Sequence, residues 1–202
     1  PAEPLFRSSI MRTIQERLDC LRMSIQEQDF LTGKGLSNEV NIRIFCYDPA
    51  DEIIVQHFME QLTSDQSLRC RPIERNLYRI FLSICDELDI LDAVEEMEEE
   101  DGGEYLLNEL HSSAGTDEFI EKINDTPHRE GDVLILTGIG DVFPFMRVHT
   151  LLEAIQKYYA DIPILVMYPG KFDGHQLRLF GRLRPSDYYR AFSMVQEQER
   201  ET

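Results

Sequence analysis

A short apolar run that ends in two glycines does most to limit the folds open to this chain of 202 residues. The apolar residues 133–136 are followed by a Thr-Gly-Ile-Gly segment at 137–140, and a helix-like pattern begins at Pro144. Continuous apolar strands of this kind are typical of parallel sheets with both faces covered. The stretch therefore predicts a central strand that leads into a loop at the carboxyl edge of such a sheet.

Strand-like and helix-like segments alternate along the rest of the chain. The helix-like segments repeat apolar residues every three or four positions, whereas the strand-like segments are short and largely apolar. This alternation predicts an α/β fold with an open, mainly parallel sheet flanked by helices on both faces, Rossmann-like or P-loop-like but without a Walker A loop. Strands are expected near 42–47, 68–74, 132–137 and 162–168, and helices near 5–28, 49–62, 77–91, 104–124 and 144–158.

The last third of the chain differs in character. A Pro-Gly pair at 169–170 is expected to turn the fourth strand, and an Asp-Gly pair at 173–174 is a second tight-turn signal. Further short strands are expected at 176–180 and 188–192. Together these features predict a mixed or antiparallel C-terminal edge to the sheet.

We expect a single α/β domain over residues 1–202, with an acidic helical insertion at about 86–125 and a polar tail at about 196–202. Between Asp86 and Asp101 the sequence has ten carboxylates and no basic residue. Such a run is typical of a solvent-exposed helix. The sequence leaves open a second interpretation, an acidic docking surface for a basic partner.

The net charge restricts the classes of partner. With 20 Lys and Arg against 38 Asp and Glu, the formal charge is −18, which disfavours direct binding of nucleic acid. No apolar run approaches the roughly 20 residues that cross a bilayer, and the first residues lack the pattern of a signal peptide. The four cysteines are scattered along the sequence, a pattern that favours reduced thiols over disulfides or a metal site. We therefore expect a cytoplasmic protein that does not bind a membrane.

In an open α/β sheet, ligands bind outside the carboxyl ends of the strands. This rule brings together Asp48, the loop with Gly138 and Gly140, and the segment with Tyr168 and Gly170. Glycines after a strand allow a close backbone approach, and the start of the following helix would offer unpaired N–H groups to an anion. Because Gly-Ile-Gly is not the Gly-x-Gly-x-x-Gly of dinucleotide sites, a purely conformational need for glycine is the competing interpretation.

Basic residues concentrate at two places near this edge. Arg147 and His149 lie in the first turn predicted after residue 144, and two residues turn a helix by about 200°, so we do not expect both to face one ligand. For His149 a structural hydrogen bond is the main alternative to a catalytic role. The C-terminal region could hold a phosphate, a nucleic-acid end or an acidic partner, or simply face solvent. Its candidate residues are Lys171, Asp173, Arg178, Arg182, Arg184, Tyr188, Tyr189 and Arg190.

The sequence contains no catalytic signature. It lacks a Walker A loop, the Gly-x-Ser-x-Gly motif, the His-Glu-x-x-His motif and any Cys/His cluster with metal spacing. Asp48 follows an apolar strand as a Walker B aspartate does, but Pro49 beside it favours helix capping. The sequence therefore nominates no catalytic residue, no metal ligand and no cofactor, and we favour a protein that is not an enzyme.

Three segments together resemble one known family. They are residues 137–152 (TGIGDVFPFMRVHTLL), 168–181 (YPGKFDGHQLRLFG) and 188–192 (YYRAF), with supporting matches at 35–40 and 48–49. In these segments the chain resembles the BrxB family of the BREX bacteriophage-exclusion systems. The C-terminal segments are the more specific ones, whereas the acidic middle carries no family signature.

The resemblance implies a role in cytoplasmic antiviral defence, beside a large ATPase, a DNA methyltransferase and an alkaline-phosphatase-like PglZ protein. It implies no catalytic activity and transfers no catalytic residue. We expect an adaptor that docks on other BREX proteins, the PglZ-like component first and the ATPase or methyltransferase as alternatives. The competing hypothesis is a nucleotide- or phosphate-binding domain that uses the 137–140 loop and nearby basic residues.

Overall fold

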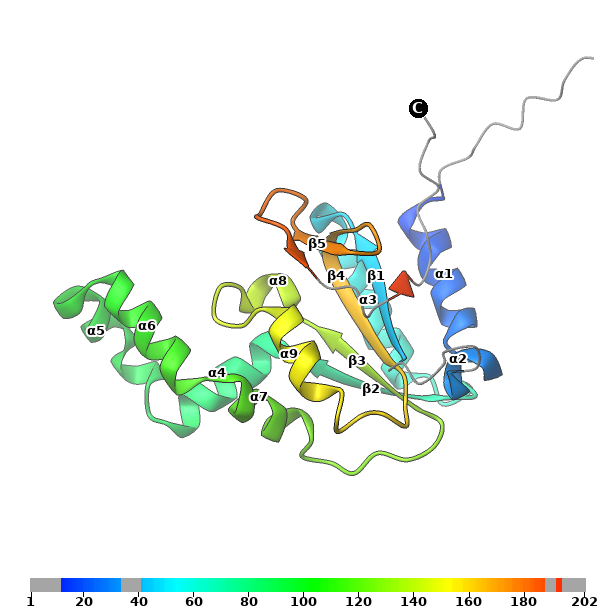
Figure 1. Cartoon of the computed structure of the whole chain (residues 1–202), viewed down its shortest axis with the longest axis horizontal. Helices are drawn as coiled ribbons and strands as arrows, with labels where there is room; N and C mark the ends of the chain where they lie inside the picture. The colour runs from blue at the N-terminus through cyan, green and yellow to red at the C-terminus, as the bar shows by residue number, and fades with distance from the viewer. Residues whose placement is uncertain (1–11, 34–40, 188–191, 194–202) are drawn as a thin grey trace, which may run out of the picture.

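The computed structural model describes residues 12–33, 41–187 and 192–193, and it has the predicted α/β architecture (Figure 1). Its strands are β1 (Ile42–Tyr47), β2 (Arg71–Asn76), β3 (Asp132–Thr137), β4 (Ile164–Phe172), β5 (Gln176–Leu179), β6 (Ser186–Asp187) and β7 (Phe192–Ser193). Its longer helices are α1 (Ile14–Ser24), α3 (Glu52–Ser64), α4 (Leu77–Glu87), α6 (Gly103–Ser113), α7 (Thr116–Ile123) and α9 (Val148–Ile155). α5 (Val94–Asp101) is as long as α7 and α9, and the shorter helices are α2 (Gln28–Thr32), η1 (Pro49–Asp51), η2 (Leu91–Ala93) and α8 (Ile139–Val142).

The central sheet is parallel, with strand order β2-β3-β4-β1-β7. In register, Ile164 of β4 lies between Ile42 of β1 and Leu134 of β3. This order is neither the Rossmann nor the flavodoxin order of doubly wound sheets. At the end of β4, the antiparallel strands β5 and β6 extend the sheet, as predicted for the C-terminal edge.

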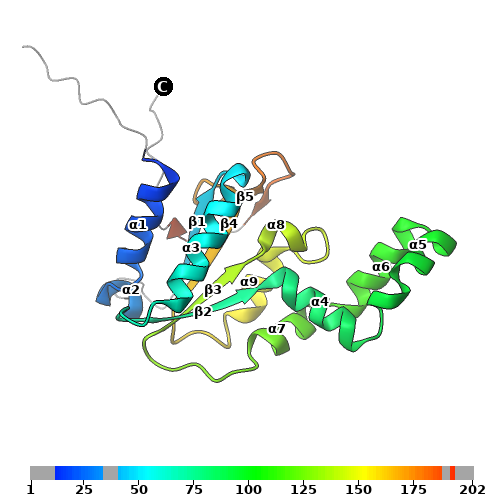
Figure 2. The same cartoon turned by 180° about the vertical axis from the view of Figure 1, so that it is seen from behind.

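Helices cover both faces of the sheet, as the alternating pattern predicted (Figures 1 and 2). Even-numbered residues of β1, β3 and β4 pack in one apolar cluster with α4, α7 and α9. The odd-numbered residues pack on the opposite face with α1 and α3. Side chains alternate across a strand, so a strand that is apolar at every position belongs between two helical layers.

The N-terminal helix begins later than predicted within the described residues. Thr13 caps α1 in a capping box with Glu16, and the helix ends at Ser24 before the separate helix α2. Leu18 and Leu21 of the predicted apolar stripe are fully buried. The part of the predicted helix before residue 12 lies outside the described residues.

Two expectations about the strands were wrong. The second strand begins at Arg71 and not near 68, and β4 does not turn at Pro169-Gly170 but continues to Phe172. It continues because Gly170 pairs with Leu179 of β5, so the hairpin turn falls at Asp173-Gly174. There the Asp173 carboxylate accepts hydrogen bonds from the backbone N–H groups of His175 and Gln176, at 2.9 and 2.8 Å.

The expected helix from Pro144 to about Tyr158 was also wrong in its first turn. α8 ends at Val142, the Phe143–Pro144 peptide bond is cis, and α9 begins only at Val148. The N–H groups just after the proline are already used, because Phe145 and Met146 both donate to the Val142 carbonyl, at 2.8 and 3.3 Å. The predicted anion site at a helix start near Pro144 is therefore absent from this segment.

The acidic run forms part of a helical projection, which we call the acidic arm and define as residues 91–113. Helices α5 and α6 lie far from the sheet in both views (Figures 1 and 2), and α5 has no buried residue. α6 anchors the arm through the buried Leu106 and Leu110. The break predicted at Gly115 is confirmed, because α6 ends at Ser113 and α7 begins at Thr116.

Candidate functional site

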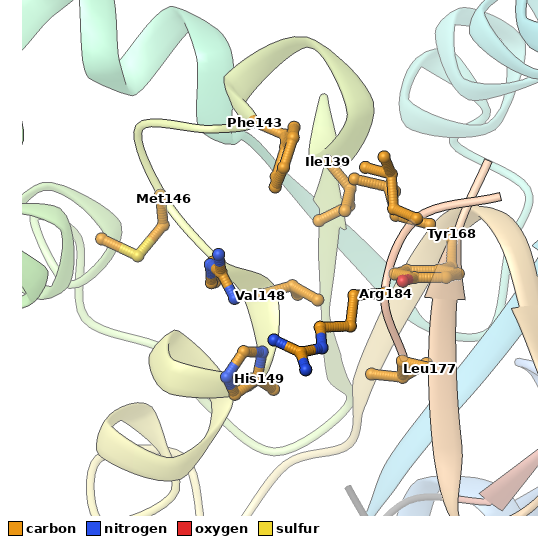
Figure 3. A pocket seen from close by; sticks show the side chains of 11 residues that line it. Ile139, Phe143, Met146, Val148, His149, Tyr168, Leu177 and Arg184 are labelled. Carbon is orange, nitrogen blue, oxygen red and sulfur yellow. The ribbon is translucent and has the colours of Figure 1, made fainter. Parts of the chain in front are cut away.

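A pocket of about 270 Å³ lies at the carboxyl edge of the sheet, between the α8–α9 segment and the β5 hairpin (Figure 3). This is where the rule for open α/β sheets places a ligand. Its walls are mainly apolar, and its polar groups come from two arginines, a histidine and a tyrosine. The lining residues are Ile139, Phe143, Met146, Arg147, Val148, His149, Tyr168, Leu177, Leu179, Leu183 and Arg184.

One wall comes from the hairpin of β4 and β5. Leu177 and Leu179 are buried on the inner face of β5, whereas Arg178 between them is exposed. The hairpin approaches β4 closely at Gly170, where a Cβ atom would lie 2.3 Å from the backbone oxygen of Arg178. Gly170 is thus required by packing. Tyr168, two residues earlier, is buried in the pocket wall, and burial raises the pKa of its hydroxyl above the ordinary value.

The opposite wall contains two residues, Arg147 and His149, that were not expected to face the same ligand. Arg147 and His149 both line the pocket, which corrects the expectation that they face different ways. Arg147 is the N-cap of α9 and has extended backbone angles, φ −102° and ψ 123°. The helical turn of about 100° per residue does not apply to a residue outside the helix, so the prediction failed at its first step.

Arg184 was expected only as a member of the C-terminal basic region, and the structure places it in the pocket. It follows β5 in the chain, and its side chain extends toward His149 of α9 (Figure 3). Its only signal in the sequence is the basic cluster between residues 171 and 190. Its meeting with Arg147, 37 positions earlier in the chain, depends on how the hairpin folds back over α9.

The surroundings of His149 in the pocket favour its neutral form. Burial first, and then the nearby Arg147 guanidinium, lower the pKa of His149 below its ordinary value of 6.5, while Glu153 opposes them. A neutral imidazole donates or accepts hydrogen bonds without adding charge. The positive charge at the pocket therefore comes from the two arginines.

Replacing Arg147 with Gln should raise the pKa of His149, because one of the two causes that lower it is removed. The measurement is an NMR titration of the His149 ring protons in wild type and Arg147→Gln. Arg182→Gln is the matched control, since Arg182 does not line the pocket, and it should leave the titration unchanged. An unchanged His149 pKa in the Arg147 variant would show that the two side chains do not interact.

The glycines of the 137–140 loop are explained by packing. Gly138 has a left-handed φ of +68°, and a Cβ there would lie 2.5 Å from Oδ1 of Asn76. A Cβ at Gly140 would lie 2.9 Å from the Phe180 ring and 3.2 Å from Pro169. The room beside these glycines is thus taken by protein side chains, which favours the conformational interpretation over a phosphate loop.

The remaining candidates have separate positions. Asp48 caps η1 by accepting a hydrogen bond from the Ala50 N–H at 2.9 Å, in the role that the sequence favoured. Arg178 and Arg182 are exposed and do not line the pocket. Lys171 lies directly opposite Arg178 across the β4–β5 ladder. Tyr188, Tyr189 and Arg190 lie outside the described residues.

The described part of the chain contains no group of three or more His, Cys, Asp or Glu residues placed to hold a metal ion. None of the helices among these residues is long and apolar enough to span a membrane. The pocket between α9 and the β5 hairpin is one place where a small ligand would fit. It offers hydrogen bonds, positive charge and an apolar wall.

The fold and the pocket define an open α/β protein with a parallel sheet and a basic ligand pocket at its carboxyl edge. A family model described as BREX protein BrxB matches residues 73–194. A BREX protein BrxB of Bacillus cereus (strain H3081.97) is 36% identical over 193 residues, covering 92% of this chain and 99% of that protein. A BREX protein BrxB of Escherichia coli O9:H4 (strain HS) is 29% identical over 189 residues, covering 90% of this chain and 92% of that protein.

The chain therefore belongs to the BrxB family of the BREX phage-defence systems, as its motifs indicated. No solved structure matches it significantly.

Proposed function

We propose that this chain is a non-enzymatic adaptor that joins components of a BREX phage-defence system in the cytoplasm, with the PglZ-like component as its main partner. Membership of the BrxB family supports a role within BREX. The adaptor role rests on how charge is distributed over the molecule. The acidic arm carries carboxylates and no Lys or Arg, whereas three exposed cations lie on or beside the β4–β5 hairpin. Such an arrangement is expected of a protein that contacts more than one charged surface.

The observation that carries the proposal is a pair of cations on the β4–β5 hairpin. Lys171 and Arg178 face each other across the ladder, and both are exposed. Like charges in directly opposed positions destabilise a sheet. With Arg182 in the turn that follows, they form what we call the basic hairpin face (Lys171, Arg178 and Arg182). None of the three forms an ion pair with another described residue.

An acidic partner would offset this repulsion. In a chain with a net charge of −18, three exposed cations on one hairpin are unusual. A partner carboxylate between Lys171 and Arg178 would turn an unfavourable pair into a favourable triad. The basic hairpin face is accordingly the docking surface that we propose.

The acidic arm supplies a second surface of opposite sign. It carries most of the carboxylates between Asp86 and Asp101, and α5 has no fully buried residue. Large apolar side chains on or beside it are also exposed: Leu88 (51%), Leu91 (38%) and Tyr105 (47%). An arm of this composition suits a basic partner, which is the interpretation of the acidic run that the sequence left open.

Reversing the charge of the basic hairpin face should weaken binding to the PglZ-like component. For Arg178→Glu with Arg182→Glu we expect the affinity to fall about tenfold or more, mostly through a slower association rate that loses its salt dependence. The measurement is a titration of each purified BREX protein with the wild-type chain and with the double variant, at low and at physiological salt.

The matched control is Arg69→Glu with Arg79→Glu, which changes the net charge by the same amount on two exposed arginines far from the hairpin in sequence. It should bind as the wild type does. If both double variants bind equally well, the basic hairpin face is not the contact. If the wild type binds none of the BREX proteins, the adaptor proposal itself fails.

A further inference from the structure

We propose that the pocket between α9 and the β5 hairpin binds a small phosphate monoester whose organic part is flat and largely apolar. In this arrangement the organic group enters the pocket and the phosphate lies at its mouth, between Arg147 and Arg184. This site is separate from the basic hairpin face, because the two use opposite faces of β5.

The shape and the lining of the pocket support this proposal. The opening of about 270 Å³ is concave, and most of the side chains that line it are apolar. Ligand pockets are typically somewhat larger, roughly 300–1,000 Å³, and are lined mainly by apolar and aromatic groups. The size of this one fits a single ring system. Tyr168 and Phe143 offer aromatic surface to such a ring (Figure 3).

The positive charge at the pocket mouth supports an anionic ligand. Two guanidinium groups, of Arg147 and Arg184, line the same opening, and both residues are exposed. Among the described residues neither forms an ion pair, although the protein has almost twice as many acidic as basic residues. The pocket lining contains no Asp or Glu at all. Two arginines with no carboxylate in the lining beside them are the arrangement expected of an anion site, although Glu153 lies close enough to affect the pKa of His149.

The number of arginines indicates the charge of the bound anion. Two guanidinium groups match a phosphate dianion, each in a bidentate pair, whereas a single carboxylate would leave one of them unmatched. His149 stands beside them as a neutral hydrogen-bonding group that repels neither arginine. The combination of an apolar pocket with a dianion site at its mouth selects an organic phosphate over inorganic phosphate.

The test uses phenyl phosphate as the probe, with inorganic phosphate and phenol as its two halves. We expect phenyl phosphate to bind the full chain in calorimetry and to raise its melting temperature. Inorganic phosphate and phenol should each bind at least tenfold more weakly, because each makes only half of the contacts. Adenosine monophosphate, tested in parallel, distinguishes a nucleotide from a smaller aromatic phosphate as the natural ligand.

Arg147→Gln and Arg184→Gln should each weaken phenyl phosphate at least tenfold, and Arg182→Gln should not, since it removes the same charge from the same hairpin outside the pocket. The proposal is overturned if phenyl phosphate gives neither heat nor thermal stabilisation at millimolar concentration. It is also overturned if inorganic phosphate binds equally well, or if the Arg182 variant loses binding as the pocket variants do. The variants' unliganded melting temperatures show whether they are folded.

Discussion

Replacing Gly170 with Ala should lower the free energy of unfolding by about 3 kcal/mol or more, because a methyl group at this position has no place to go. The added Cβ would lie 2.3 Å from the Arg178 backbone oxygen, 2.9 Å from the Tyr168 ring and 3.1 Å from the Leu179 Cα atom. Two of these neighbours are backbone atoms of β5 and do not move by changing a rotamer. The hairpin must therefore separate from β4 or the strand must bend.

The loss should reach beyond stability, because the same hairpin forms one wall of the pocket. Gly170→Ala should abolish phenyl phosphate binding even where the variant is still folded. Gly103→Ala is the control: it has no left-handed φ, and its nearest neighbour would be a flexible glutamate oxygen at 3.5 Å. Its stability should change by less than about 1 kcal/mol. Urea unfolding of the three proteins measures their stability, and calorimetry with phenyl phosphate measures binding. Equal stability of Gly170→Ala and wild type would contradict the observed β4–β5 packing.

Replacing Asp132 with Asn should lower the free energy of unfolding at pH 7 by about 2–3 kcal/mol. The Asp132 carboxylate is buried at the start of β3, where it accepts two hydrogen bonds from the Arg71 guanidinium, at 2.7 and 2.6 Å, and one from the Arg129 N–H at 2.8 Å. The pair with Arg71 also fixes the start of β2 against β3. Asn keeps the shape but loses the charge and one of the acceptor oxygens.

The same pair predicts how stability depends on acid. Burial alone would raise the pKa of Asp132, but the hydrogen bonds from Arg71 and Arg129 outweigh it and hold the pKa below the ordinary 3.8. A depressed carboxyl pKa contributes stability above the unfolded value, and this contribution is lost as the pH falls through the folded value. The difference between wild type and Asp132→Asn should therefore be constant near neutrality and shrink below about pH 4.

The exposed Asp125, which pairs with Arg75 at 2.7 Å, supplies the control. Asp125→Asn should cause a much smaller loss, because the Asp125 side chain is 61% exposed and its charge is largely screened by water. Urea unfolding of wild type, Asp132→Asn and Asp125→Asn at several pH values measures these differences. A gap between wild type and Asp132→Asn that persists unchanged at pH 3 would contradict the depressed pKa.

The buried strands could be predicted from the sequence because their environment leaves a local signal. β1 and β3 have the expected bounds, since strands covered on both faces are apolar at nearly every position. β2 was misplaced by about three residues because it is an edge strand, paired only with β3, and its residues are half-buried and mostly polar. A pattern of this kind resembles a loop.

The pocket was only partly predictable because its parts meet through tertiary contacts. The rule of carboxyl strand ends gave its location, and Arg147, His149 and Tyr168 do line it. The rule did not give Arg184 or the inner face of β5. The positions of Arg184 and of β5 depend on β4 continuing past Pro169. The Pro-Gly pair predicted a turn there, but pairing with β5 makes the continued strand favourable. The same hairpin places Arg178 on the exposed face of β5, whereas Arg184 after it lines the pocket.

The measurement that tests the central claim most directly is co-purification from cells that contain a complete BREX system. The tagged wild-type chain should elute with at least one other BREX protein, with the PglZ-like component as the most abundant. The Arg178→Glu and Arg182→Glu double variant should elute with much less of it, and the Arg69→Glu and Arg79→Glu control should match the wild type. A wild-type chain that elutes alone, from cells in which phage defence is active, would contradict the adaptor function.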